Sequence, residues 1–185
     1  MIPAAMREAQ GAAWYPSERV VPQLALRIAP EKAVVEVHVR SARLTDLDAS
    51  VRMLARDGVH HGEALSDADY LRNLLFVPSA TVVVAEAARR VVGVGVLAIR
   101  PSVRYGPFVG VVDELAVASG SELDAADRRR VADEIVEHLA ASARNKGCTR
   151  VEVAEPLASA ELALWKRAGF ASSGRTLSRS VGMHR

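Results

Sequence analysis

Hydrophobic periodicity is absent from the first part of this chain and sustained through the rest. Residues 1–32 have no regular period and hold four of the eight prolines, which predicts an N-terminal extension to a domain spanning 33–185. Apolar and polar residues then alternate over 35–40, a pattern typical of a strand with one buried face. Trp14 and Tyr15 in the extension are expected to pack on the domain or on a second subunit, which leaves a homodimer open, and a locally folded tail is the plainer alternative.

Two amphipathic helices are predicted after this strand. The first runs from a capping hydroxyl at Thr45 to Gly58, with apolar residues at helical spacing between them. The second begins with a cap at Ser66 and ends before Pro78. Together they indicate a pair of short helices joined by a loop.

Runs of β-branched residues at 80–85 and 91–99, separated by 86–90, then predict a β-hairpin. Gly93 and Gly95 remove two side chains from its second strand, which favours a bulge or a close backbone contact over a phosphate-binding loop, because no helix follows them.

The last third of the chain alternates strands and helices. Strands that flank a crossover helix pair in parallel, whereas hairpin strands pair antiparallel, so the order predicts a mixed α/β sheet. The predicted elements are a strand at 108–117, the longest helix ending at Gly147, a strand at 148–153, a helix at 158–168 and an extended segment from 169 to about 181.

The composition indicates which cellular compartment and which classes of partner to expect. Half of the 185 residues are apolar and a quarter are charged, which is typical of a soluble globular protein. Cys148 is the single cysteine, no apolar run approaches the roughly 20 residues of a membrane helix, and the N-terminus lacks signal-peptide order, so we expect a cytoplasmic protein without a membrane partner. A net charge of +2 and few aromatic residues argue against a nucleic-acid partner.

Three segments together resemble the GNAT N-acetyltransferase superfamily, over roughly residues 35–181. The segment at 160–170 (AELALWKRAGF) is similar to the family's ending with alanine, an aromatic residue, glycine and phenylalanine. The segment at 146–153 resembles the end of its long helix and its fifth strand, and 113–117 resembles its fourth strand. The resemblance implies an α/β fold with a mixed, mostly antiparallel sheet flanked by helices, whose fourth and fifth strands are parallel and splayed.

The same resemblance implies an enzyme that transfers an acyl group, usually acetyl from acetyl-CoA, to an amine on a small molecule or a protein. In the family, the pantetheine arm pairs with the backbone of the fourth strand, and a glycine-rich loop before the long helix holds the pyrophosphate. Here that loop falls on 127–132, where only Ala132 matches, so arginine forks are expected to replace the glycines. The expected cofactor-binding residues are Leu115, Ala116, Val117, Arg128, Arg129, Arg130, Val131 and Ala132.

Two other interpretations of this helix start remain open. Asp124 can cap the helix and Asp127 can occupy its first turn, where both would repel a phosphate. Three adjacent arginines can also form a solvated face. Either case favours a catalytically silent GNAT-like module that binds or regulates a partner.

Candidate catalytic residues lie in the strand at 108–117. Glu114, and less strongly Asp113, is the expected base for the amine proton; strict alternation would turn only one of them into the cleft. The alternative is a structural acid paired with a residue such as Arg104. Many relatives place a tyrosine acid where this chain has Trp165, which cannot protonate a thiolate and is expected to be an apolar anchor.

The remaining chemically active side chains are interpreted as structural. His60 and His61 lie in a glycine-flanked loop, and two histidines without a third ligand do not make a zinc site, so no metal is expected. Cys148 follows a helix end at the start of a strand and is expected to pack in the core.

Overall fold

The computed structural model describes residues 36–56, 64–120 and 122–171. The chain divides into two units, Met1–Ala33 and Val34–Arg185, and the first lies outside the described residues. His60, His61 and the expected final strand beyond residue 171 also lie outside them.

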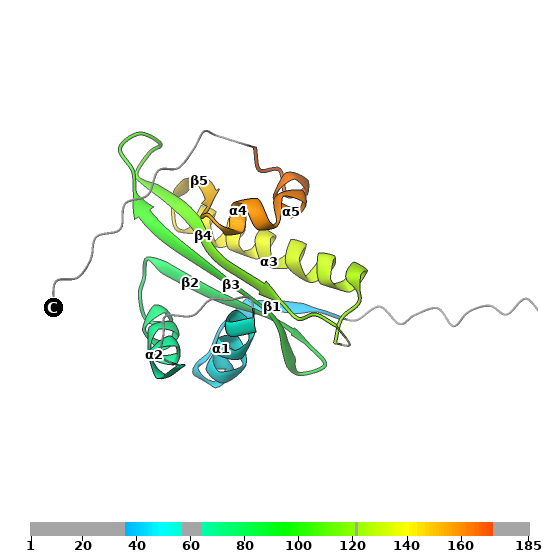
Figure 1. The fold of residues 1–185 in the computed structure, drawn as a ribbon. Helices are drawn as coiled ribbons and strands as arrows, with labels where there is room; N and C mark the ends of the chain where they lie inside the picture. Colours follow the sequence, from blue (N-terminus) through cyan, green and yellow to red (C-terminus); the bar gives the residue numbers. More distant parts are fainter. Residues whose placement is uncertain (1–35, 57–63, 121, 172–185) are drawn as a thin grey trace, which may run out of the picture. The chain divides into compact units, whose positions relative to one another are not determined.

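A five-stranded sheet forms the centre of the second unit (Figure 1). Its order follows the chain; β4 and β5 pair in parallel, and every other neighbouring pair is antiparallel. This confirms the expected mixed sheet. The strands are β1 (His38–Ser41), β2 (Ala80–Ala87), β3 (Arg90–Pro101), β4 (Phe108–Val117) and β5 (Cys148–Val153).

Helices cover both faces of this sheet, with α1 and α2 on one face and α3, α4 and α5 on the other (Figure 1). The helices are a 3-10 turn η1 (Leu44–Asp46), α1 (Leu47–Arg56), α2 (Ala64–Leu74), α3 (Ala125–Asn145), α4 (Leu157–Ala160) and α5 (Leu162–Arg167).

Two predicted helix starts are wrong by a few residues. Thr45 lies inside η1, because the Asp46 carboxylate accepts a hydrogen bond from the Arg43 amide (2.8 Å) and so fixes the start at Arg43. The second helix begins at Ala64, so Ser66 lies within its first turn. Alanine and leucine precede Ser66, and both are strong helix formers.

The two glycines of β3 allow α3 to lie directly on the sheet. A Cβ atom on Gly93 would stand 2.6 Å from Ile135 Cδ1, and one on Gly95 would stand 2.5 Å from Ile135 Cγ2. Ile135 is fully buried, so it has no room to move away. Of the two predicted alternatives, a bulge or a close contact, the structure shows the close contact at both glycines, and it sets the distance between α3 and the sheet.

A partly buried ion network joins the elements at the opposite edge of the sheet. Arg40 of β1 donates to Asp46 (Nη1–Oδ2, 2.7 Å) and to Glu86 of β2 (Nη2–Oε2, 2.7 Å). The Arg40 guanidinium lowers the pKa of the Asp46 carboxyl from its ordinary value, mainly through these hydrogen bonds. The charges at this edge are thus paired within the fold.

Candidate functional site

Strands β4 and β5 separate halfway along β4. Their parallel pairing covers residues 108–112 of β4, and the last contact is the Ala154 amide, which donates to the Val112 carbonyl at 3.0 Å. The chain then enters α4 through Pro156. Within the described part of the chain, residues 113–117 therefore pair only with β3. This confirms the expected splay and leaves one edge of β4 open.

A β-bulge interrupts β4 at the point where the strands separate. Val96 of β3 lies opposite Glu114, but the next residue, Leu97, lies opposite Val112, so Asp113 is an extra residue on β4. Both Asp113 and Glu114 line the same cavity. The prediction that strict alternation turns only one acid into the cleft is wrong, because the bulge interrupts the alternation.

The open edge presents the peptide groups of alternate residues. The Ala118 amide donates to Val92 of β3 at 2.9 Å, so the strand alternation also directs the peptide groups of Ala116 toward β3. Those of Leu115 and Val117 are directed to the open edge, and both residues line the cavity. Ala116, only 1% exposed, is therefore a correction to the expected cofactor-binding set.

The cavity has a volume of about 840 Å³. Its walls are the open half of β4, the N-terminal turns of α3, and the segment from Glu155 through α5. Four carboxylates and three guanidinium groups line it, and none of its described lining residues carries a hydroxyl, thiol or imidazole group. The charged lining residues are Asp113, Glu114, Glu155, Glu161, Arg128, Arg129 and Arg167.

The first turns of α3 divide the predicted arginine cluster. Arg128 and Arg129 line the cavity together with Ala132. Among the described residues, neither arginine forms an ion pair. Successive helical residues are rotated by about 100°, so three neighbouring side chains cannot share one face.

Two residues of the predicted set lie elsewhere on α3 and are corrections. The Arg130 side chain lies 3.6 Å from Glu134 (Nε–Oε1) and lines a separate depression of about 560 Å³. Val131 is fully buried against the sheet. Both follow from the helix rotation, which the register of α3 on β3 fixes.

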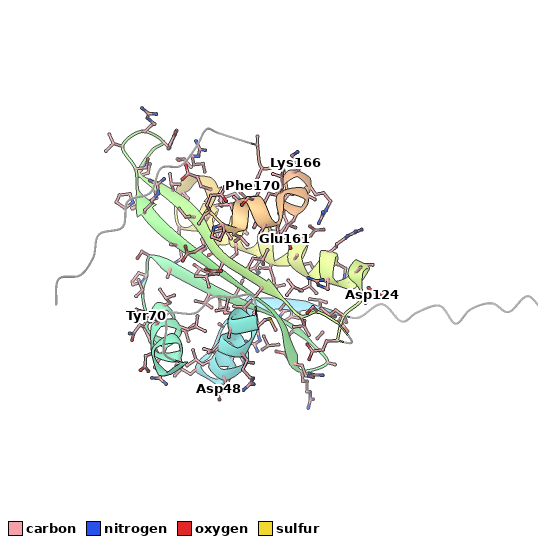
Figure 2. The ribbon with its side chains drawn as sticks, in the orientation of Figure 1. Asp48, Tyr70, Asp124, Glu161, Lys166 and Phe170 are labelled. Atoms are coloured by element: carbon pink, nitrogen blue, oxygen red, sulfur yellow. The ribbon has the colours of Figure 1, made fainter. Side chains whose placement is uncertain are left out.

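A carboxylate caps the start of α3, as one of the alternatives anticipated. The Asp124 side chain accepts a hydrogen bond from the Asp127 amide at 2.8 Å (Oδ1–N). Figure 2 shows Asp124 at this helix end and Glu161 at the junction of α4 and α5. One of the amides that could approach an anion at the helix end is therefore already occupied.

Sequence reasoning missed Arg167, which reaches the cavity from α5. Its Nη2 atom lies 3.0 Å from Asp133 Oδ1 on α3. The residue falls inside the segment that carries the family resemblance, but the sequence holds no signal for the direction of its side chain. That direction depends on how α5 packs against α3.

The other candidates have structural surroundings. Trp165 is 3% exposed, its Nε1 donates to the Leu157 carbonyl (3.1 Å), and its ring packs edge-on to Phe170, so it is an anchor in the core. Partial burial raises the pKa of the Cys148 thiol, although Lys146 opposes this shift, which disfavours a nucleophile. Arg104 precedes β4, and roughly 16 Å of extended strand separates the start of β4 from the two acids.

No group of three or more His, Cys, Asp or Glu in the described ranges is arranged to hold a metal ion. The helices of the described ranges are all too short or too polar to cross a bilayer.

The model of the acetyltransferase (GNAT) family matches residues 48–170, and the chain belongs to this family. Among curated proteins no sequence matches the chain.

Solved structures similar to this chain include several N-acetyltransferases. One is a probable acetyltransferase (20% identity, 80% of this chain and 99% of the other, TM-score 0.64). Another is an aminoglycoside N-acetyltransferase in complex with CoA (17%, 80% and 95%, TM-score 0.64). A third is a ribosomal-protein-alanine N-acetyltransferase from Brucella melitensis biovar Abortus 2308 (18%, 80% and 100%, TM-score 0.62). At these identities the likeness shows the fold.

Proposed function

We propose that this protein is an N-acyltransferase that uses acetyl-CoA as its acyl donor. The observation that carries the proposal is the cavity at the open edge of β4. In the described chain, this cavity is lined by peptide groups of β4 that pair with no strand and by two arginines that have no carboxylate partner. A volume of about 840 Å³ falls within the range of small-molecule sites. The residues present therefore fit a ligand with an amide-rich arm and a phosphate end.

The donor-binding residues follow from these walls. The peptide groups of Leu115 and Val117 would bind the amides of the pantetheine arm, as an added strand would. Arg128 and Arg129 would bind the phosphates with planar guanidinium forks, in place of a glycine-rich loop. When bound, acetyl-CoA supplies an acetyl thioester that an amine can attack.

The acceptor side depends on Glu114 and Asp113. Glu114 is proposed to take the proton of the attacking ammonium group, directly or through water, and Asp113 beside it attracts the cationic acceptor. No hydroxyl acid is available among the described lining residues, so the sulfur leaves as a thiolate, which is a tolerable leaving group. The neighbours' activities suggest testing both aminoglycoside-like amines and protein α-amino groups as acceptors.

Calorimetric titration with acetyl-CoA tests the donor site. Arg128→Ala and Arg129→Ala should each weaken binding about tenfold, because each removes a charge-assisted hydrogen bond. Arg130→Ala is the matched control: it removes the same charge from the same run, but its side chain lines the separate depression, so the affinity should not change. Equal losses in all three variants would indicate a general effect of charge and contradict the assignment.

A catalytically silent binding module is the second candidate, and the Asp124 cap favours it. A carboxylate at the helix end opposes phosphate binding there. Asp124→Ser keeps a capping hydroxyl and removes the charge. A wild-type protein that gains no thermal stability from acetyl-CoA, with an Asp124→Ser variant that does, would support the silent module.

A further inference from the structure

Arg167 and Asp133 join α5 to α3 beside the cavity. Arg167 lies in the last turn of α5 and lines the cavity, whereas Asp133 lies on α3, directly after the cavity-lining Ala132. Their side chains form one ion pair, Nη2 to Oδ1 at 3.0 Å. The pair thus links the two helices at the edge of the cavity, and Asp133 itself lines the separate depression next to it.

This ion pair is poorly suited to stabilising the fold. The side chains of Arg167 and Asp133 are 45% and 46% exposed, and ion pairs so open to water contribute little to stability. The guanidinium group has further N–H donors besides the one that Asp133 accepts. Arg167 lines the cavity and is held by one exposed carboxylate. A phosphate can therefore replace some of the water molecules around its guanidinium group at little cost in free energy.

We propose that Arg167 is a third phosphate-binding residue, supplied by α5, and that Asp133 of α3 is the residue that positions it. This inference rests on the proposed function, because it assigns the ligand's phosphate end to the same cavity. Guanidinium groups from two helices would then contact the phosphates. The loss of the family's glycine loop is compensated by side chains of α3 and α5 together.

The test compares two ligands that differ in their phosphates: coenzyme A, which carries them, and pantetheine, which does not. Arg167→Ala should weaken calorimetric binding of coenzyme A about tenfold and leave pantetheine binding unchanged. Arg167→Lys keeps the charge but loses the planar fork, so it should recover only part of the affinity. The matched control is Arg100→Ala. Arg100 is an exposed arginine of β3 that pairs with Glu152 of β5 (Nη2–Oε2, 2.7 Å) and does not line the cavity.

The positioning role of Asp133 predicts a smaller effect with the same ligand dependence. Asp133→Asn should weaken coenzyme A binding about threefold, with pantetheine unchanged. Tighter binding of coenzyme A by Asp133→Asn would show that the carboxylate competes with phosphate, which overturns the positioning role.

The outcomes also separate this inference from the proposed function. Equal weakening of both ligands by Arg167→Ala would mark a structural role and overturn the inference, as would an unchanged affinity for coenzyme A. In either case the Arg128 and Arg129 variants still decide the donor site. Absence of coenzyme A binding by the unaltered protein would overturn both.

Discussion

The two halves of strand β4 are continuous in sequence but have different surroundings. Residues 108–112 pair with strands on both sides, and Val112 is 1% exposed. Residues 113–117 pair only with β3 in the described chain, and they open with two acids. The first half is therefore closed by a strand on each edge, and the second half borders the cavity along its open edge.

The difference between the halves arises from local geometry. The bulge at Asp113 interrupts the alternation of the strand, and β5 leaves the sheet directly after Ala154. A charge at Val112 would be buried without a partner, whereas the charge at Asp113 faces a cavity. A single strand can thus stabilise the sheet with its first half and line a binding site with its second half, and the extra residue of a bulge marks the boundary between them.

The largest effect is expected from moving a charge across this boundary. Val112→Asp places a carboxylate in the closed half and should lower the free energy of unfolding by more than about 4 kcal/mol or prevent folding. Asp113→Val, one residue further, should change it by less than about 0.5 kcal/mol. Urea denaturation measures both values, and similar losses would show that the two halves do not differ.

The next largest effect concerns catalysis in the open half. Glu114→Gln should lower turnover by about 10²- to 10⁴-fold, with little change in acceptor affinity, because it removes the proposed base. Asp113→Asn should lower turnover by less than about tenfold. Steady-state kinetics with an amine identified from the acceptor panel provides the measurement. A larger loss in Asp113→Asn would reassign the base to that residue.

A smaller effect is expected from the packing of α3 on β3, the strand that pairs with β4. Gly93→Ala should cost about 1–3 kcal/mol, because the new methyl group meets Ile135 Cδ1 at 2.6 Å. Ile135→Val removes that atom and by itself should cost about 0.5–1.5 kcal/mol. The double variant should be more stable than the sum of the two losses predicts. Strict additivity in thermal or urea unfolding would contradict the close contact.

The smallest effect is expected from Asp46, at the other edge of the sheet, where the carboxylate pairs with Arg40 and does not face a cavity. The folded state lowers the pKa of Asp46, so its contribution is fully present above the unfolded value of about 4 and is lost as the pH falls through the lower folded value. Asp46→Asn should cost about 1–2 kcal/mol at pH 7 and flatten the loss of stability below about pH 4. An unchanged acid limb in denaturation curves would contradict this pairing.

Much of the architecture could be predicted before the structure, because it depends on local patterns. Alternation and helical spacing identified the strands and the longer helices within the described ranges, but the single helix expected over 158–168 is divided at Glu161 into α4 and α5. The glycines at 93 and 95 indicated a bulge or a close contact, and the structure shows a close contact with α3. The cap at Asp124 also follows from local chemistry, since a carboxylate bonds an amide three residues along the chain. Helix starts at Thr45 and Ser66 failed because competing local bonds and propensities shifted them.

The sequence by itself determined the family, the order of the elements and the segments that meet at the site. The tertiary structure decided which side chains face the cavity: it admits Arg128, Arg129 and the unforeseen Arg167, and it turns Arg130 away. It also brought both acids to one side through the bulge. The reason is physical: the rotation of a helix and the register of a strand are set by the surfaces against which they pack, and those surfaces come from distant parts of the chain.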